Sequence, residues 1–299
     1  MQLAFIGLGK MGYGMVSRLI KGGHNVVVYD VSPEATAKAK QIGAKTTSFL
    51  KDAVKNLKGQ KIIWLMIPNQ FVENTIEKLK PILPKESILI DGGNSHFEIS
   101  KKRGEDLEKS GIKFLDIGTS GGLRGAEIGY SMMAGGDKGA YDIVEPIIKS
   151  LSIEKGYNYF GPYGAGHFVK MVHNAIEYGF MGAMAEGFDL LKRGPYKDLN
   201  MLEITRVWNS NSIIKSFLME IMEQVFSKNK NLGNIPNEIG DSGEGRWSVE
   251  TALKYNVPFT INTYALFSRY ISRDKDKWSN KIQAALRREF GGHTNKERA

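Results

Sequence analysis

The chain contains no cysteine among its 299 residues. This absence excludes a disulfide framework, a thiolate-ligated metal and a catalytic thiol. No apolar run approaches the length of a bilayer span, and residues 2–6 begin an apolar strand pattern directly, without the basic region of a signal peptide. We therefore expect a cytoplasmic protein with no metal centre and no membrane partner.

Charge of one sign is not concentrated in any part of the chain, although the formal net charge is +9. Residues 1–180 hold 23 Lys and Arg against 18 Asp and Glu, and residues 181–299 hold 18 against 14. A nucleic-acid-binding protein gathers basic residues on one face, often with an aromatic motif. The even distribution disfavours nucleic acid as a partner, whereas a diffuse positive field also attracts small phosphorylated or carboxylated substrates.

Short apolar runs alternate with amphipathic stretches in the first half of the chain. The runs predict strands over residues 3–7, 25–29, 61–67, 87–91 and 113–117. The stretches between them predict helices over residues 11–21, 33–42, 71–79 and 99–110. Such alternation is typical of βαβ units, so we expect an α/β, Rossmann-type doubly wound domain with a mostly parallel sheet.

Strand patterns stop near residue 164. Helical patterns follow over residues 165–193, 199–208, 212–227, 248–255, 260–271 and 277–290. Residues 228–245, rich in Asn and Gly, predict a long loop, most simply a surface connection. The sequence therefore predicts a dinucleotide-binding domain over residues 1–163. An all-α domain for substrate binding and dimerisation follows over residues 164–299 and ends in a C-terminal tail.

A glycine-rich turn follows the first predicted strand and opens a helix. It reads Gly7-Leu8-Gly9-Lys10-Met11-Gly12 and fits the G-x-G-x-x-G pattern in the context that dinucleotide binding requires. Asp30 ends the second strand, where a carboxylate accepts a hydrogen bond from the ribose 2′-hydroxyl. Val31 offers no cation for a 2′-phosphate. We expect NAD as the cofactor, with NADP as a weaker alternative, and Met66 as a further cofactor contact.

Two polar loops lie at the ends of later strands. Asp91-Gly92-Gly93-Asn94-Ser95 places Asn94 where ligands collect in open α/β sheets, while Ser95, with Glu98 three residues on, predicts a helix N-cap. The second loop, residues 118–125, contains Ser120, Gly121 and Gly122 and exposes backbone donors that suit a carboxylate or a phosphate. An ordinary tight turn explains the second loop equally well.

One helix carries a narrow polar stripe. Lys170, His173, Asn174 and Glu177 recur at i, i+3, i+4 and i+7, and the residues around them are almost all apolar. Lys and Glu are rarely buried unless they are paired. The stripe therefore indicates either an internal Lys–Glu ion pair or a cleft that holds a base, hydrogen-bond donors and an acid on one element.

These motifs together resemble 6-phosphogluconate dehydrogenase, within the β-hydroxyacid dehydrogenase superfamily. The resemblance extends from Gly7 to His293. Its more specific parts are residues 91–95, 170–178, 243–247 and 287–293. The chain is similar to the short branch of the family, which often uses NAD and lacks a second, duplicated helical half.

The resemblance implies a role for each matching position. Lys170 would take the C3 hydroxyl proton as hydride leaves for the nicotinamide, and after loss of CO₂ Glu177 would protonate C1. A lysine in a mostly apolar cleft has a lowered pKa, as a base near neutrality requires. The implied substrate contacts are Asn94, Ser120, Gly121, Gly122, His173, Asn174, Tyr178, Arg269, Arg287 and His293, and Asn94 would bind the cofactor as well. Arg287 and His293 would come from a partner's tail, which implies a homodimer or a dimer of dimers.

Two positions depart from the familiar members of the family. Ser242 stands where those members have a phosphate-binding lysine, and Val31 stands where they have an arginine. The first departure leaves the expected phosphate site without the lysine of the family. The second favours NAD as the cofactor.

The resemblance implies NAD-dependent oxidative decarboxylation of 6-phospho-D-gluconate to ribulose 5-phosphate and CO₂, a reaction of the pentose phosphate pathway and of gluconate utilisation. Two alternatives stay open. One is a non-decarboxylating dehydrogenase of small β-hydroxy acids such as 3-hydroxyisobutyrate. The other is a non-catalytic redox sensor that binds NAD, which would gain support from a closed ion pair between Lys170 and Glu177.

Overall fold

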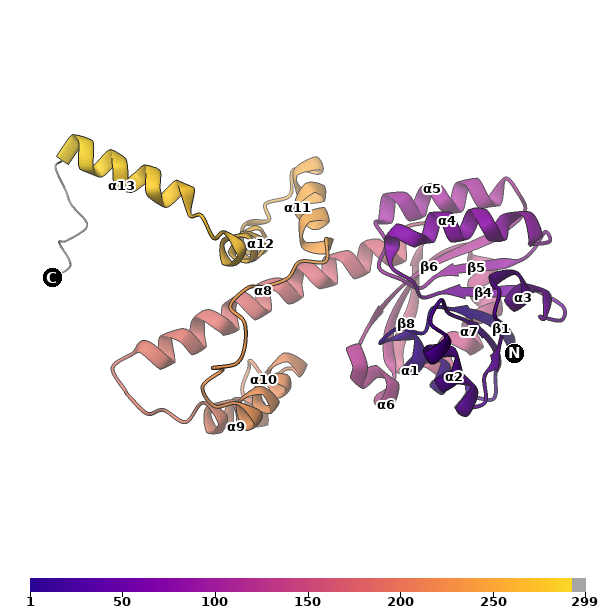
Figure 1. The fold of residues 1–299 in the computed structure, drawn as a ribbon, viewed down its shortest axis with the longest axis horizontal. Coiled ribbons are helices and arrows are strands. Elements are labelled where there is room, and N and C mark those ends of the chain that lie inside the picture. Colours follow the sequence, from indigo (N-terminus) through magenta and orange to yellow (C-terminus); the bar gives the residue numbers. More distant parts are fainter. Residues whose placement is uncertain (292–299) are drawn as a thin grey trace. The chain divides into compact units, whose positions relative to one another are not determined.

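The structure, a computed structural model, describes residues 1–291. The chain divides into two compact units, Met1–Asn174 and Ala175–Ala299 (Figure 1). The first unit contains the whole sheet, and the second is helical. The predicted α/β fold class, followed by an all-α part, is confirmed.

The sheet of the first unit has eight strands in the order β3-β2-β1-β4-β5-β6-β7-β8. All neighbouring pairs are parallel except β6 with β7. The order of the first six strands is the doubly wound arrangement of dinucleotide-binding domains. The strands are β1 (Gln2–Ile6), β2 (Asn25–Tyr29), β3 (Lys45–Thr46), β4 (Ile62–Leu65), β5 (Ile88–Asp91), β6 (Lys113–Ser120), β7 (Tyr130–Gly136) and β8 (Ser152–Gly161).

Both faces of this sheet are covered because successive side chains of a strand point to opposite sides. In β1, Leu3 and Phe5 join one apolar cluster, which α1 and α7 complete. Ala4 and Ile6 join a second cluster with α4 and α5. The helices are α1 (Gly12–Lys21), α2 (Pro33–Gln41), α3 (Leu50–Lys55), α4 (Asn69–Leu79), α5 (Phe97–Glu108), α6 (Gly125–Ile128) and α7 (Lys138–Leu151), with short 3₁₀ turns η1 (Lys80–Ile82) and η2 (Gly122–Arg124).

The second unit consists of helices, and three of them, over residues 165–193, 201–211 and 217–228, share a small core of Phe188, Met219 and Phe226. The helix α8 begins in the first unit and continues into the second. The helices are α8 (Ala165–Arg193), α9 (Met201–Asn211), α10 (Phe217–Lys228), α11 (Glu244–Lys254), α12 (Thr260–Arg273) and α13 (Trp278–Gly291). The loop predicted over residues 228–245 is present between α10 and α11.

Several predicted elements differ from the structure. The strands β3, β7 and β8 were not predicted from the sequence. Most residues of β8 are at least partly exposed, so this strand lacks the buried alternation that marks a strand. The helices α3, α6 and α7 were also missed. The predicted helix start at residue 212 is wrong, because the Ser216 hydroxyl accepts from the Met219 N–H and caps α10 four residues later.

Within residues 1–291, no helix is long and apolar enough to cross a membrane. The same residues contain no cluster of three or more His, Cys, Asp or Glu side chains that could hold a metal ion.

Candidate active site

The turn between β1 and α1 is shaped by two glycines that tolerate no side chain. A Cβ atom on Gly7, whose φ is +100°, would lie 2.3 Å from the Met66 carbonyl oxygen. A Cβ on Gly12 would lie 2.1 Å from the Gly7 carbonyl oxygen. Gly9 differs, because no atom of the described residues lies within 4 Å of its Cβ position. The open side at Gly9 is where a pyrophosphate could approach the backbone, and the tight glycines hold the turn.

Asp30 lies just beyond β2 and faces this turn. Its Oδ2 accepts a hydrogen bond from the Leu8 N–H at 2.6 Å, and its Oδ1 accepts from the Ser32 N–H at 2.7 Å. The carboxylate therefore lies beside the glycine turn, as ribose recognition requires. The Val31 side chain is 87% exposed and brings no positive charge. These residues fit a dinucleotide with a free 2′-hydroxyl.

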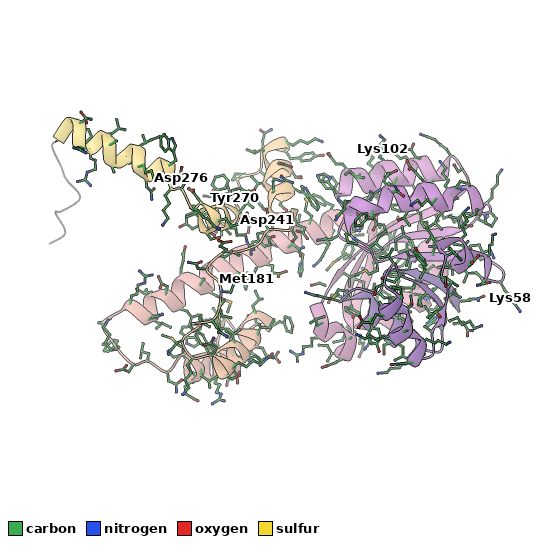
Figure 2. The ribbon with its side chains drawn as sticks, viewed as in Figure 1. Lys58, Lys102, Met181, Asp241, Tyr270 and Asp276 are labelled. Carbon is green, nitrogen blue, oxygen red and sulfur yellow. The ribbon has the colours of Figure 1, made fainter. Side chains whose placement is uncertain are left out.

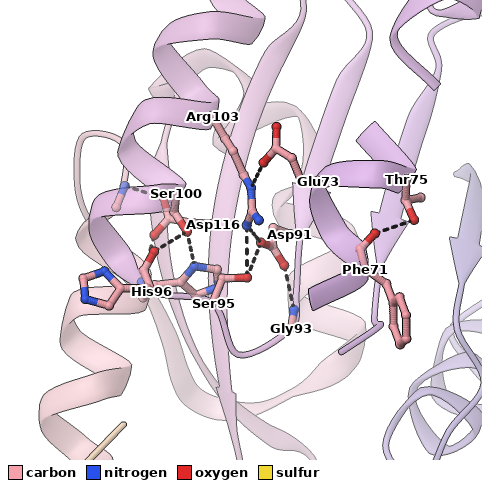
Figure 3. Close-up of polar contacts among 12 residues, drawn as sticks. Phe71, Glu73, Thr75, Asp91, Gly93, Ser95, His96, Ser100, Arg103 and Asp116 are labelled. Atoms are coloured by element: carbon pink, nitrogen blue, oxygen red, sulfur yellow. Dashed lines mark hydrogen bonds and ion pairs between the residues drawn. The ribbon is translucent and has the colours of Figure 1, made fainter. Parts of the chain in front are cut away.

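The loop after β5 is held by a buried acid (Figure 3). Asp91 accepts hydrogen bonds from the Gly93 N–H, the Ser95 hydroxyl and the Arg103 guanidinium at 3.1, 2.7 and 3.1 Å. Arg103 also forms an ion pair with Glu73 on α4 at 2.9 Å. The predicted capping role of Ser95 is wrong, because its hydroxyl is turned inward to Asp91. His96 caps α5 instead, with its Nδ1 accepting from the Glu98 N–H.

This network leaves Asn94 exposed at the tip of the loop, at the carboxyl end of β5. Ligands of doubly wound sheets collect at this end of the strands. Arg103 was not predicted from the sequence, because a lone arginine in a helix rich in charged residues gives no sign that it reaches a buried aspartate.

The second glycine loop follows β6 and meets the polar stripe of α8. The Ser120 hydroxyl lies 3.1 Å from His173 Nε2, and the Lys170 amine lies 3.3 Å from His173 Nδ1. The Asn174 side-chain oxygen lies 3.0 Å from the same Nδ1. Gly121 has φ of +119° and Gly122 φ of +54°, conformations that favour glycine.

Four predicted site residues are thus joined through one of them, because Ser120, Lys170 and Asn174 each contact His173. Lys170 is 8% exposed, so its amine is held in a largely buried setting. The arrangement places a base candidate next to hydroxyl, imidazole and amide groups that can bind a polyhydroxy acid. Glu177 is half-buried and lies two helical turns beyond Lys170 on α8.

A second cluster of predicted residues lies in the second unit. The Arg269 guanidinium stacks on the Tyr178 ring, 3.5 Å from its centroid. The Tyr178 hydroxyl donates to Asp241 at 3.2 Å. Asp241 lies in the loop beside α8 (Figure 2). Burial raises the pKa of the Tyr178 hydroxyl, so it stays a donor at neutral pH.

Arg269 also donates to the Gly240 carbonyl, so the loop that contains Asp241 and exposed Ser242 is bound to α8 and α12. Asp241 was not predicted from the sequence, because nothing local in this loop indicates the contact with Tyr178. Arg287 is exposed on α13 and makes no hydrogen bond or ion pair within the described part of the chain. His293 lies outside the described residues.

The sequence matches two parts of one family. Residues 2–161 match the NAD-binding domain of 6-phosphogluconate dehydrogenase, and residues 166–298 match the C-terminal domain of the same enzyme. The chain is 40% identical to an NAD(+)-dependent, decarboxylating 6-phosphogluconate dehydrogenase of Haloferax volcanii over 98% of both chains. It is 37% identical to the decarboxylating 6-phosphogluconate dehydrogenase of Lactococcus lactis, covering 91% of this chain but 61% of that longer one.

Solved structures give the same result. A Plasmodium falciparum 6-phosphogluconate dehydrogenase matches all of this chain and 67% of its own, with a TM-score of 0.84 and 28% identity. A 3-hydroxyisobutyrate dehydrogenase of Mycobacterium tuberculosis matches 91% of this chain with a TM-score of 0.71 at 19% identity, which shows the shared fold alone.

Proposed function

Because the chain belongs to the 6-phosphogluconate dehydrogenase family, we propose that it oxidises 6-phospho-D-gluconate with NAD and decarboxylates the product to ribulose 5-phosphate and CO₂. The observation that carries this proposal is the contact group of Ser120, Lys170, His173 and Asn174. It unites a basic amine with the polar groups that a sugar acid needs, and Ser120 ends β6 at the same edge of the sheet as the glycine turn that follows the parallel strand β1.

Lys170 is the general base of the proposed reaction. Its amine takes the proton of the C3 hydroxyl, while bound NAD supplies the nicotinamide that accepts the hydride from C3. His173 lies within hydrogen-bond distance of both the Lys170 amine and the Ser120 hydroxyl, through its two ring nitrogens. It therefore orients the amine and the substrate hydroxyls together. The resulting 3-keto acid loses its carboxylate as CO₂, because the adjacent ketone takes up the electron pair.

Glu177 supplies the second proton. The enediol left after loss of CO₂ must gain a proton at C1 to become the ketose, and an acid on the same helix as the base can deliver it. The spacing of seven residues keeps both groups on one face of α8. Asn94, Gly121 and Gly122 complete the proposed substrate contacts.

The phosphate of the substrate would bind near Tyr178 and Arg269. A guanidinium fork and a phenol hydroxyl are suited to phosphate oxygens. Ser242 contributes no charge, so Arg269 has a larger share of the binding than it would beside a lysine.

The tail of a partner subunit would complete the phosphate site with Arg287 and His293. The helix α13, which carries Arg287, has no buried residue in the described chain. Its Trp278, Ile282 and Leu286 recur every four residues and are 63%, 45% and 57% exposed. Such an apolar stripe on one helix face requires a cover. We propose a second copy of this chain as that cover, and hence a homodimer.

Initial rates with 6-phosphogluconate and either NAD or NADP test the proposal. We expect NADH formation together with stoichiometric CO₂ and ribulose 5-phosphate, and a higher kcat/KM with NAD. Lys170→Met should lower kcat by about 10²- to 10⁴-fold, the usual contribution of a general base. Glu177→Gln should slow ketose formation more than NADH formation. Oxidation of 3-hydroxyisobutyrate without activity on 6-phosphogluconate would replace this proposal with the small hydroxy-acid alternative.

A further inference from the structure

The first turn of α8 is capped by a residue from a distant strand. Gly164 precedes α8 and has no side chain that could accept from the free N–H groups of the turn. Asp116 of β6, fully buried, takes this place (Figure 3). One carboxylate oxygen accepts from the Gly164 N–H at 2.8 Å and the other from the His167 N–H at 2.8 Å. A carboxylate at a helix N-terminus is also favoured by the helix dipole.

The face of β6 that carries Asp116 stays in contact with α8 over the following residues. A Cβ atom on Gly118 would lie 2.3 Å from the Lys170 Cβ, so the strand backbone is in direct contact with the lysine stem. The Ser120 hydroxyl then contacts His173. Every second residue of the strand thus meets every third residue of the helix: Asp116 with His167, Gly118 with Lys170, and Ser120 with His173.

This contact leaves no space for the helix to move toward the strand. A Cβ on Gly166 would lie 2.3 Å from the Asp116 carbonyl oxygen and 2.5 Å from the Met133 carbonyl oxygen. The His167 ring is also held, because its Nδ1 lies 2.7 Å from the Ser100 hydroxyl of α5. The start of α8 is therefore defined by backbone contact and by two hydrogen bonds to one carboxylate.

Burial opposes the charge of that carboxylate. It raises the pKa of Asp116, whereas His167 and the two N–H donors act in the opposite direction. An ionised group in such a position costs stability, so its presence is better explained by what it orients than by a gain in folding free energy.

We propose that Asp116 is a positioning residue for Lys170. Its two hydrogen bonds fix the first turn of α8 on β6 and thereby set where the Lys170 amine lies relative to Ser120 and His173. This inference rests on the proposed function, in which Lys170 is the base. A misplacement of about 1 Å can cost a reaction about 10²-fold.

The variant Asp116→Asn tests the inference. Asparagine keeps one acceptor, but its NH₂ group would face the other backbone N–H. We expect kcat with 6-phosphogluconate to fall by about 10- to 100-fold. The KM for NAD should stay within about twofold, because the glycine turn belongs to other elements. Asp137→Asn is the matched control: Asp137 caps α7 through the Ala140 N–H at 2.6 Å, and no proposed site residue lies on α7.

A second pair of variants tests, without changing a charge, whether the place of α8 on β6 sets kcat. Gly118→Ala should push against the Lys170 stem and lower kcat in the same way. Gly187→Ala places the same methyl group on α8 where no atom of the described residues lies within 4 Å, and should leave kcat unchanged. If Asp116→Asn does not fold, the comparison of Gly118→Ala with Gly187→Ala decides whether kcat depends on the place of α8 on β6, and an unchanged kcat in Gly118→Ala would overturn the inference.

A double-variant cycle separates positioning from general stability. If Asp116 acts through Lys170, then Asp116→Asn should lower the residual rate of the Lys170→Met enzyme by less than about twofold. A further loss of tenfold or more in that background would overturn the inference. So would an active wild-type enzyme whose kcat is unchanged by Asp116→Asn. A wild-type enzyme inactive on 6-phosphogluconate would instead refute the proposed function. In that case, faster hydrogen exchange at residues 164–170 in Asp116→Asn alone, and not in Asp137→Asn, would still support the capping role.

Discussion

The double substitution Asp30→Asn and Val31→Arg is expected to reverse the cofactor preference. It should also weaken the glycine turn, for a reason that the structure shows. Asp30 does more than face the ribose, because it also binds the Leu8 and Ser32 N–H groups at 2.6 and 2.7 Å. Asparagine offers one acceptor oxygen, so one of these backbone groups would face an NH₂ group. The glycine turn loses part of its support at the same time as the ribose loses its acceptor.

A hydrogen bond to a charged group contributes about 1.5–3 kcal/mol, which corresponds to about 10- to 150-fold in an equilibrium constant. We therefore expect kcat/KM with NAD to fall by about 10- to 150-fold in the double variant. The arginine at position 31 would bind the 2′-phosphate with a similar contribution. The ratio of kcat/KM for NAD to that for NADP should thus change by about 10²- to 10⁴-fold.

Initial rates at saturating 6-phosphogluconate, with each cofactor varied in turn, measure this ratio. Asp142→Asn is the matched control, because it removes the same charge from an exposed ion pair with Lys138 on α7. Exposed ion pairs contribute little, so the control should leave the ratio unchanged. The single variant Asp30→Asn should lose efficiency with both cofactors, since it weakens the turn that both would use. A double variant with the wild-type ratio, or a wild-type enzyme that favours NADP, would refute the reasoning.

Three further predictions concern the phosphate site, the tail and the pH dependence of stability. Arg269→Lys removes the guanidinium that stacks on Tyr178, so the KM for 6-phosphogluconate should rise by about 10- to 150-fold with the KM for NAD unchanged. Equal rises in both KM values would argue against a phosphate role. Deletion of residues 287–299 should raise the KM for 6-phosphogluconate at least as much, and an unchanged KM would exclude the tail from the site. Burial lowers the pKa of His24, so the folded state favours the neutral ring and stability should fall as the pH drops below about 6.5. Thermal unfolding at pH 7.5 and 5.5 should therefore show a larger loss for the wild type than for His24→Gln, and equal losses would contradict the assignment.

Local patterns were sufficient for most of the fold. The alternation of buried strand runs with amphipathic helices, and the spacing of Gly7, Gly9 and Gly12, depend on residues close together in the chain, and the structure contains the predicted doubly wound domain. The helix α8 was predicted at its observed bounds, because apolar residues recur along its 29 positions and no proline interrupts them. Its polar stripe could be found for the same reason, since i, i+3, i+4 and i+7 lie on one face of any helix.

Contacts between distant parts of the chain were decided only by the tertiary structure. Ser95 has the local signature of an N-cap, but a buried Asp91 with Arg103 beside it offers its hydroxyl a stronger partner. Asp116 lies in an apolar strand, where no residue close to it in the sequence indicates a partner. Its two carboxylate oxygens accept from N–H groups that lie 48 and 51 residues away along the chain. The sequence determines which side chains an element presents, because that follows from helix and strand periodicity. Which of those side chains meet depends on strand order and helix packing, and no local pattern encodes either.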